Sequence, residues 1–172
     1  HLFGQNTYVV EGKSGLGVYR IKPDVQETIS RFPTPDYIND VALTSTGDAA
    51  YLCDEDAGLA AVDHNDLDGE PVVFPAAGCS VIEILSDAIY TLEGGDLLRI
   101  ADLASPGGGV TQSVPGATGL FPGQNAVYVT DGESLQIIDP TGGTIPRTVD
   151  TPGTAEDVVV VGAYAYVADG GN

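Results

Sequence analysis

Tyr128-Val129-Thr130-Asp131-Gly132 is the clearest copy of a motif that occurs five times along this chain of 172 residues. Successive copies place their tyrosines 38 to 43 residues apart. A fixed period in this range is typical of repeat architectures, in which each unit is one supersecondary motif. The other copies are Tyr8-Val9-Val10-Glu11-Gly12, Tyr51-Leu52-Cys53-Asp54-Glu55, Tyr90-Thr91-Leu92-Glu93-Gly94 and Tyr166-Val167-Ala168-Asp169-Gly170.

Each repeat unit is expected to form four short strands. In the fourth unit the first strand is predicted to end at 120–121, and the other three are predicted at 126–130, 134–139 and 144–150. Such segments are rich in Val, Ile and Tyr, and the breaks between them carry the Gly, Pro, Asn and Asp that tight hairpins require. No stretch shows sustained helical periodicity. The uninterrupted apolar run at 158–161 predicts a strand buried on both faces.

Four-stranded units of about forty residues pack radially into a β-propeller, which typically has about 4–8 blades. We therefore expect one all-β region over residues 1–172, a β-propeller of four-stranded antiparallel blades with four blades and a partial fifth. The approximate blade boundaries are 1–35, 36–77, 78–115, 116–153 and, for the partial blade, 154–172.

Two segments, 126–131 and 154–169, resemble the YVTN and LVIVD families of propeller repeats. The resemblance extends over the whole chain and is strongest from residue 120 onward. Members of these families are mostly secreted or surface proteins of bacteria and archaea. The resemblance therefore implies an extracellular, cell-surface or periplasmic location, and it carries no catalytic motif that could be transferred to residues of this chain.

The charge balance is strongly acidic, with 25 acidic and 6 basic residues and a net charge of −19. A phosphate backbone needs clustered Lys and Arg, so we expect no nucleic-acid binding. No apolar run approaches the ~20 residues of a membrane span. The charge favours cations, basic proteins or neutral ligands as partners, although solubility alone, or a high-salt habitat, also explains it.

The predicted fifth blade contains only its first two strands. An open end would expose the apolar faces of the end blades and an unpaired strand edge, which mark an interaction site or an aggregation hazard. Three explanations are open. These residues belong to a longer polypeptide, a second chain supplies the missing strands or blades, or a closed four-blade ring carries an extra hairpin.

An acidic side chain follows each predicted second strand. In a propeller these turns lie on one face, where carboxylates would ring one end of the axis and bind a cation or a basic partner. The alternative is that Asp-Gly is simply what a tight hairpin turn needs. The residues that carry the partner-binding prediction are Glu11, Asp56, Glu93, Asp131 and Asp169.

The loop at 63–70 is rich in oxygen-bearing side chains and is the candidate for a calcium site. Its possible ligands are Asp63, Asn65, Asp66 and Asp68. The spacing departs from the EF-hand pattern, so a polar connection between two strands is the alternative. No other cofactor is expected.

Cys53 and Cys79 are the only cysteines. Sequence alone leaves open whether they form a disulfide, which requires close Cα atoms, or remain two buried thiols. The recurring tyrosines are interpreted as packing between blades, with a stacking platform for sugars as the alternative.

No catalytic residue is assigned. His64 is the only internal histidine, and the chain has neither a GxSxG elbow nor a phosphate-binding loop. The preferred interpretation is a non-catalytic, secreted or cell-surface scaffold that presents loop faces to protein partners. The alternatives are a hydrolase or lyase with a central-channel, Ca²⁺-assisted site, and a subunit of a larger envelope or redox assembly. Channel-facing carboxylates with raised pKa values would favour the enzyme.

Overall fold

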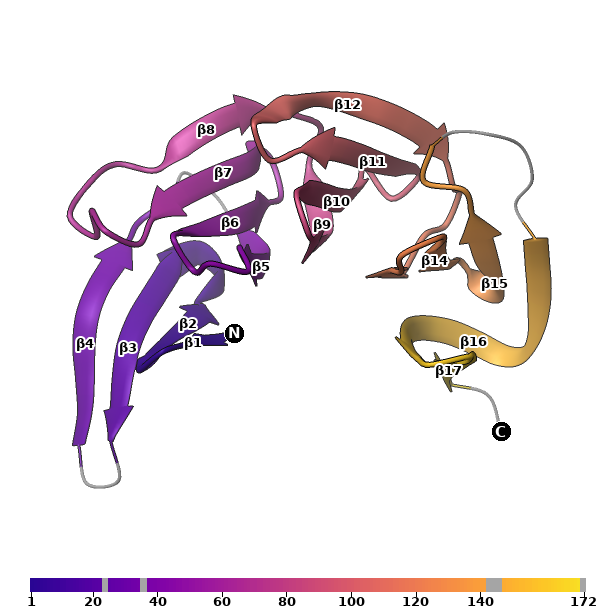
Figure 1. Cartoon of the computed structure of the whole chain (residues 1–172), viewed down its shortest axis with the longest axis horizontal. Helices are drawn as coiled ribbons and strands as arrows, with labels where there is room; N and C mark the ends of the chain where they lie inside the picture. Colours follow the sequence, from indigo (N-terminus) through magenta and orange to yellow (C-terminus); the bar gives the residue numbers. More distant parts are fainter. Residues whose placement is uncertain (23–24, 35–36, 142–146, 171–172) are drawn as a thin grey trace.

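Four antiparallel sheets stand side by side in the computed structural model and together form an arch (Figure 1). The structure describes residues 1–22, 25–34, 37–141 and 147–170. Strand order in every sheet follows the chain, with the first strand inside the arch and the fourth outside, as β5 and β8 show (Figure 1). This radial arrangement of meander sheets is a β-propeller, so the predicted fold class is confirmed.

The strand boundaries are close to those expected from the motif. The first sheet contains β1 (Leu2–Phe3), β2 (Asn6–Val10), β3 (Leu16–Lys22) and β4 (Val25–Phe32), with a 3-10 turn η1 (Gly12–Ser14). The second contains β5 (Ile38–Leu43), β6 (Ala49–Asp54), β7 (Gly58–Asp63) and β8 (Val72–Pro75). The third contains β9 (Cys79–Leu85), β10 (Ala88–Glu93), β11 (Leu97–Asp102) and β12 (Ser105–Ser113). The fourth contains β13 (Gly119–Pro122), β14 (Val127–Thr130), β15 (Gly132–Ile138), β16 (Arg147–Val161) and β17 (Tyr164–Asp169).

The fourth sheet has five strands because β16 is 15 residues long and pairs on both sides. Thr148 in its first part pairs with β15, and Val158 in its second part pairs with β17. Figure 1 shows β16 bending sharply between these parts. The fourth strand predicted at 144–150 and the first strand of the partial blade therefore form one continuous strand, although 144–146 lie outside the described residues.

Apolar side chains fill the spaces between successive sheets, and the alternation along β6 shows how one strand serves two of them. Leu52 packs in the cluster between the first and second sheets, whereas its neighbours Tyr51 and Cys53 pack between the second and third. Successive side chains of a strand point to opposite faces. Leu52 is fully buried, and burying a leucine contributes about 1.5–3 kcal/mol relative to leaving it exposed.

The expectation that the strand at 158–161 is buried on both faces is wrong. Val158 is 4% exposed, but Val159 is 47% and Val161 62% exposed. The second part of β16 contacts β13 and β14 on one side. No sheet formed by the described residues covers the other side, so the alternating side chains divide into a buried and an exposed row.

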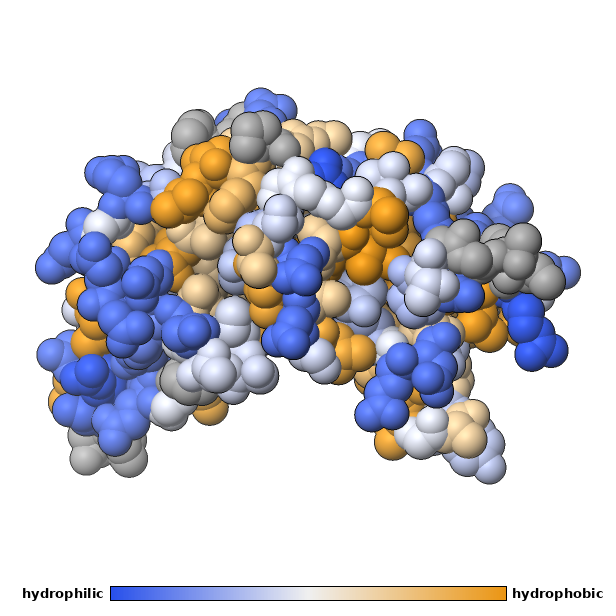
Figure 2. All heavy atoms as spheres, turned by 45° about the horizontal axis from the view of Figure 1, so that its top comes forward, coloured by the Kyte–Doolittle hydropathy of each residue, from blue (hydrophilic) through white to orange (hydrophobic). Residues whose placement is uncertain are grey.

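The arch is open. Its two ends, the first sheet and the β16–β17 hairpin, face each other across a gap (Figure 1). The explanation of a closed four-blade ring is therefore contradicted, and the other two explanations remain. Hydrophilic residues dominate the surface over the end of the arch that the first sheet forms (Figure 2). Its outermost strand β4 exposes Gln26, Glu27 and Thr28.

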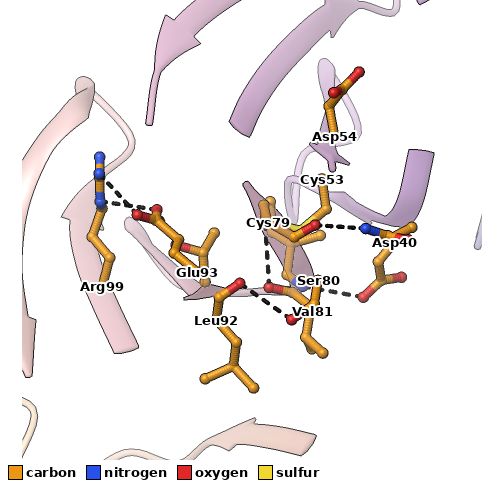
Figure 3. Close-up of a disulfide and its surroundings, with 12 residues drawn as sticks. Asp40, Cys53, Asp54, Cys79, Ser80, Val81, Leu92, Glu93 and Arg99 are labelled. Atoms are coloured by element: carbon orange, nitrogen blue, oxygen red, sulfur yellow. Dashed lines mark hydrogen bonds and ion pairs between the residues drawn. A yellow bond between two sulfur atoms is a disulfide. The ribbon is translucent and has the colours of Figure 1, made fainter. Parts of the chain in front are cut away.

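A disulfide joins Cys53 on β6 to Cys79 on β9 and so links the second sheet covalently to the third (Figure 3). Their Cα atoms lie 5.0 Å apart, within the range that a disulfide bridges. Both half-cystines are buried. Of the two possibilities left open by the sequence, the structure has the disulfide, because β6 of the second sheet packs against β9 of the third.

Turn chemistry matches the expected Asp-Gly and related pairs. Gly58 and Gly132, each at the start of a third strand, have φ values of +84° and +83°, a region that glycine adopts most easily. A Cβ on Gly58 would lie 2.7 Å from the Ala76 Cβ. None of the described residues belongs to a helix that is long and apolar enough to cross a membrane.

Candidate functional site

The acidic turn residues end equivalent second strands and lie on one face of the arch, because the sheets share one strand order. Glu93 is 2% exposed and forms an ion pair with Arg99 of β11. The Arg99 Nη2 donates to Glu93 Oε2 at 2.9 Å (Figure 3). The Thr91 hydroxyl donates to Glu93 Oε1. This carboxylate is therefore engaged within its own sheet and is not available to a partner.

Asp131 is held in a similar way. Its carboxylate accepts hydrogen bonds from the Glu133 and Ser134 backbone N–H groups at 3.1 and 2.7 Å, and from the Gln136 side-chain amide at 2.6 Å. Burial opposes ionisation, yet these hydrogen bonds lower the pKa of Asp131 below its usual value. The turn therefore uses the charge of Asp131 to satisfy its own N–H groups.

The remaining predicted partner-binding residues differ in exposure. Glu11 is half-buried and accepts a hydrogen bond from the Tyr19 hydroxyl, with Arg31 Nη2 at 3.4 Å. Asp169 is half-buried at the end of β17, and Asp56 is exposed. Within the described ranges no group of three or more His, Cys, Asp or Glu side chains could hold a metal ion. The hydrogen bonds that Asp131 accepts within its own turn match the interpretation of the acidic residues as hairpin-turn residues.

The candidate calcium loop follows β7. Asp63, Asn65, Asp66 and Asp68 are all exposed. Asp63 Oδ1 accepts a hydrogen bond from the Asn65 backbone N–H at 2.7 Å and another from its side-chain amide at 3.2 Å. The Asp66 N–H donates to the Asp63 carbonyl. These bonds form a compact Asx turn, in which the first predicted ligand already serves the chain itself.

The same loop also connects the second sheet to the first. The Leu67 carbonyl accepts a hydrogen bond from the Ser30 hydroxyl of β4 at 2.6 Å. His64 Nδ1 is hydrogen-bonded to the Tyr8 hydroxyl of β2. The Leu67 side chain packs against the cluster between these sheets. The loop therefore has a structural task that the composition of the sequence did not indicate.

The recurring tyrosines pack between sheets in three of the five units. Tyr8, Tyr51 and Tyr90 are buried. Tyr128 is half-buried, and Tyr166 at the open end is 58% exposed. The interpretation as packing residues is confirmed for the first three units. The exposure of the last tyrosine follows from the uncovered face of the β16–β17 hairpin.

A carboxylate group that sequence reasoning missed lies on the first strands of three units. It consists of Asp40 on β5, Glu83 on β9 and Asp157 on β16. Asp40 Oδ1 accepts the Val41 N–H at 2.8 Å, and its Oδ2 accepts the Ile82 N–H of the next sheet at 3.1 Å. First strands face the inside of the arch, so this group belongs to the propeller channel.

Glu83 has the most perturbed ionisation of the group. Burial, followed by the charges of Asp40 and Asp157, raises its pKa from 4.5 to about 7. Burial also raises the pKa of Asp40, against hydrogen bonds from Ile82 and Val41 that lower it. A carboxyl group that titrates near neutrality can exchange protons with a substrate, which is the property of a general acid or base.

The sequence contained one signal of this group. Glu83 stands in the middle of the apolar segment Val81-Ile82-Glu83-Ile84-Leu85, where an ionisable side chain is unexpected unless it faces a polar interior. Asp40 and Asp157 each stand directly before a short apolar run in the sequence, at 41–43 and 158–161, which gives no sign of a shared site. Their proximity to Glu83 depends on how the units stack, which sequence spacing does not give.

The comparisons with known proteins agree with this architecture. The LVIVD repeat family matches residues 152–172, which confirms the resemblance to propeller repeats at the end of the chain. No curated protein matches the chain by sequence.

Solved structures match over nearly the whole chain. One is the computationally designed Ika8 protein, with a TM-score of 0.72 and 10% identity over 98% of this chain and 54% of that one. Another is the hydrazine synthase of Kuenenia stuttgartiensis, with a TM-score of 0.77 and 16% identity over 96% of this chain and 59% of that one. At these identities the likeness concerns the fold alone. The chain thus has the fold of a β-propeller, spans little more than half the length of these matched chains, and carries an LVIVD repeat at residues 152–172.

Proposed function

We propose that this chain is part of a non-catalytic β-propeller scaffold that is secreted or exposed at the cell surface and binds protein partners through its loop faces. The face of the β16–β17 hairpin packs against a further blade, supplied either by the same polypeptide or by a partner. In this arrangement a four-stranded sheet of the same kind covers the open end of the arch.

The exposed hairpin face is the observation that carries the proposal. Val159, Val161, Tyr164 and Tyr166 are between 47% and 71% exposed. In the preceding units the equivalent motif tyrosines Tyr51 and Tyr90 are buried against the next sheet. Stacked repeats bury their apolar faces against neighbours, and an uncovered face of this kind marks an interaction site.

The comparisons support a further blade. The two matched structures contain 1.7 to 1.9 times as much chain as the matched part, since this chain covers 59% and 54% of them. A subunit of a larger envelope or redox assembly is a related form of the proposal, because the same exposed face would hold it. Intact mass distinguishes completion within one polypeptide from completion by a partner.

The experiment compares the intact mass of the native protein with its size in solution, together with two valine variants. Val159→Asp places a charge on the hairpin face. Val110→Asp does the same on the outer strand β12, where Val110 is 51% exposed. Val159→Asp should reduce the particle to a smaller species or unfold the blade junction, and Val110→Asp should not. Equal behaviour of the two variants would argue against a covered hairpin face.

The disulfide supports the proposed location. Disulfides persist in oxidising compartments such as the extracellular space and the periplasm, and are rare in the cytosol of mesophiles. The bond between Cys53 and Cys79 therefore agrees with an extracellular, cell-surface or periplasmic protein.

A channel hydrolase or lyase is the second candidate, and the raised pKa of Glu83 is the observation that favours it. Its test is the hydrolysis of a panel of nitrophenyl glycosides and esters. An enzyme of this kind should show a rate that titrates near pH 7 and that Glu83→Gln abolishes. A rate insensitive to this substitution would remove the candidate.

A further inference from the structure

A groove between the second and third sheets opens on the face opposite the acidic turns. It encloses about 560 Å³ and is formed by three hairpin turns, β5–β6, β9–β10 and β11–β12. The groove is distinct from the channel carboxylates and from the exposed hairpin face. Its volume suits a small ligand.

The groove is lined by carboxylates and hydroxyl groups and by no cationic side chain among the described residues. Asp48, Asp87 and Asp102 come from the three different turns. The hydroxyls of Thr44 and Thr46 donate hydrogen bonds to Asp48 Oδ1, and these bonds lower the pKa of Asp48. Asp48 is therefore ionised at neutral pH.

Tyr51 contributes a largely buried side chain whose hydroxyl has no hydrogen-bond partner among the described residues. It is 7% exposed and lines the groove, and its ring stacks on Phe74 with centroids 6.5 Å apart. Burial, and then the charge of Asp48, raises its pKa. None of the described residues forms a hydrogen bond with this hydroxyl. The hydroxyl can therefore donate a hydrogen bond to a ligand in the groove or accept one from it.

A second groove shows that the carboxylates are not a property of the repeat itself. It encloses about 510 Å³ beside the β13–β14 and β16–β17 turns, and the motif tyrosine Tyr128 lines it as Tyr51 lines the first. Besides Tyr128, its polar side chains are the amides Gln124 and Asn125, and none of the described residues that line it carries a carboxylate. The acidic lining is therefore specific to the groove beside Tyr51.

We propose that this groove binds an extended organic cation bearing ammonium or guanidinium groups, either a free polyamine or a basic side chain of a partner. Carboxylates from three turns spread over this volume can each accept an N–H group. A single metal ion fits less well, because no three such side chains in the described part of the chain could hold one. The net charge of −19 attracts cations to the protein in general, and the Tyr51 hydroxyl adds an acceptor to the lining of the groove.

The test is calorimetric titration of the full chain with spermidine and, separately, with N-acetylarginine amide, at low and at physiological salt. The groove variant is Asp87→Asn/Asp102→Asn, and the matched control is Glu70→Gln/Glu133→Gln, which removes the same charge from two exposed side chains. We expect saturable binding that the groove variant weakens at least tenfold and the control less than twofold. Tyr51→Phe, which keeps the ring, should weaken binding severalfold.

Melting curves of each variant establish that the fold is retained, and the Asn and Phe substitutions are chosen to preserve it. Binding of spermidine alone would identify a free polyamine, and binding of the arginine amide alone a partner's side chain. Equal weakening by the groove and control variants, or the absence of saturable binding by either cation, would overturn the proposal. This inference does not rest on the scaffold function, so the two can fail independently.

Discussion

Replacing Glu83 by glutamine should stabilise the protein at alkaline pH and leave its stability unchanged at acid pH. The pKa of Glu83 is raised in the folded state from 4.5 to about 7, whereas the unfolded chain keeps the ordinary value. At a pH below the ordinary pKa of glutamate, Glu83 is protonated in the folded and in the unfolded state, and its ionisation favours neither. As the pH rises toward 7, the unfolded state ionises first, and the folded state loses relative stability.

The magnitude follows from the size of the shift. A rise from 4.5 to about 7 corresponds to roughly 3 kcal/mol at about 1.4 kcal/mol per pKa unit. Because Glu83 is only partly buried, solvent screening reduces the expected destabilisation to about 1–3 kcal/mol. Glu83→Gln has no charge to bury, so its free energy of unfolding at pH 8 should exceed that of the parent chain by this amount. At pH 4 the two should agree.

The assay is urea unfolding of both proteins between pH 4 and pH 8.5, with Glu70→Gln as the matched control. Glu70 is exposed on the loop after β7 and carries the same charge change, so it reports the general relief of repulsion in a chain of net charge −19. A gain for Glu83→Gln no larger than that for Glu70→Gln would refute the reasoning. So would a gain that is the same at every pH.

Three further predictions concern the structure. Replacing both Cys53 and Cys79 by alanine should lower the free energy of unfolding by about 3–4 kcal/mol, the chain-entropy value for a loop of this length, as measured by urea titration of oxidised and variant proteins. Arg99→Met should cost about 3–5 kcal/mol because it leaves the Glu93 charge buried without a partner, and adding Glu93→Gln should restore most of that loss in a double-mutant cycle. Asp66→Asn/Asp68→Asn should abolish any calcium-dependent rise in melting temperature if the loop after β7 is a calcium site. A rise that persists would exclude that loop.

Much of the fold could be predicted because the repeat unit is short and its signals are local. Strand β14 lies within the predicted segment 126–130, and Gly58 and Gly132 have the positive φ that glycine adopts in tight hairpin turns. The continuous strand β16 could not be predicted, since the expected fourth strand ended at residue 150 and the next blade began at 154, which left residues 151–153 as a connection. Whether such residues form a loop or a bulged ladder depends on the strand beside them, and the register shift between Gly132 and Ser134 accommodates them.

The candidate sites were less predictable, for a related physical reason. Acidic residues are favoured at hairpin turns by the local backbone geometry, so their number carried little information about binding. In the structure Glu93 pairs with Arg99 and Asp131 accepts the Ser134 N–H, both within their own sheet. The residues with more unusual environments, Glu83 in the channel and Tyr51 in the groove, owe them to neighbours from other units. Contacts between units depend on stacking, which a single unit does not encode.

The disulfide and the continuous strand β16 together affect how the arch responds to mechanical force. Repeat arrays usually separate at the junctions between units, because each unit contacts only its neighbours. Here the Cys53–Cys79 disulfide joins the second and third sheets covalently. Strand β16 belongs to both the fourth sheet and the β16–β17 hairpin, so no loop separates these two parts. Under a pulling force applied at the two ends, the first sheet should detach before the second and third come apart. The fourth sheet and its hairpin should then extend together as a single step.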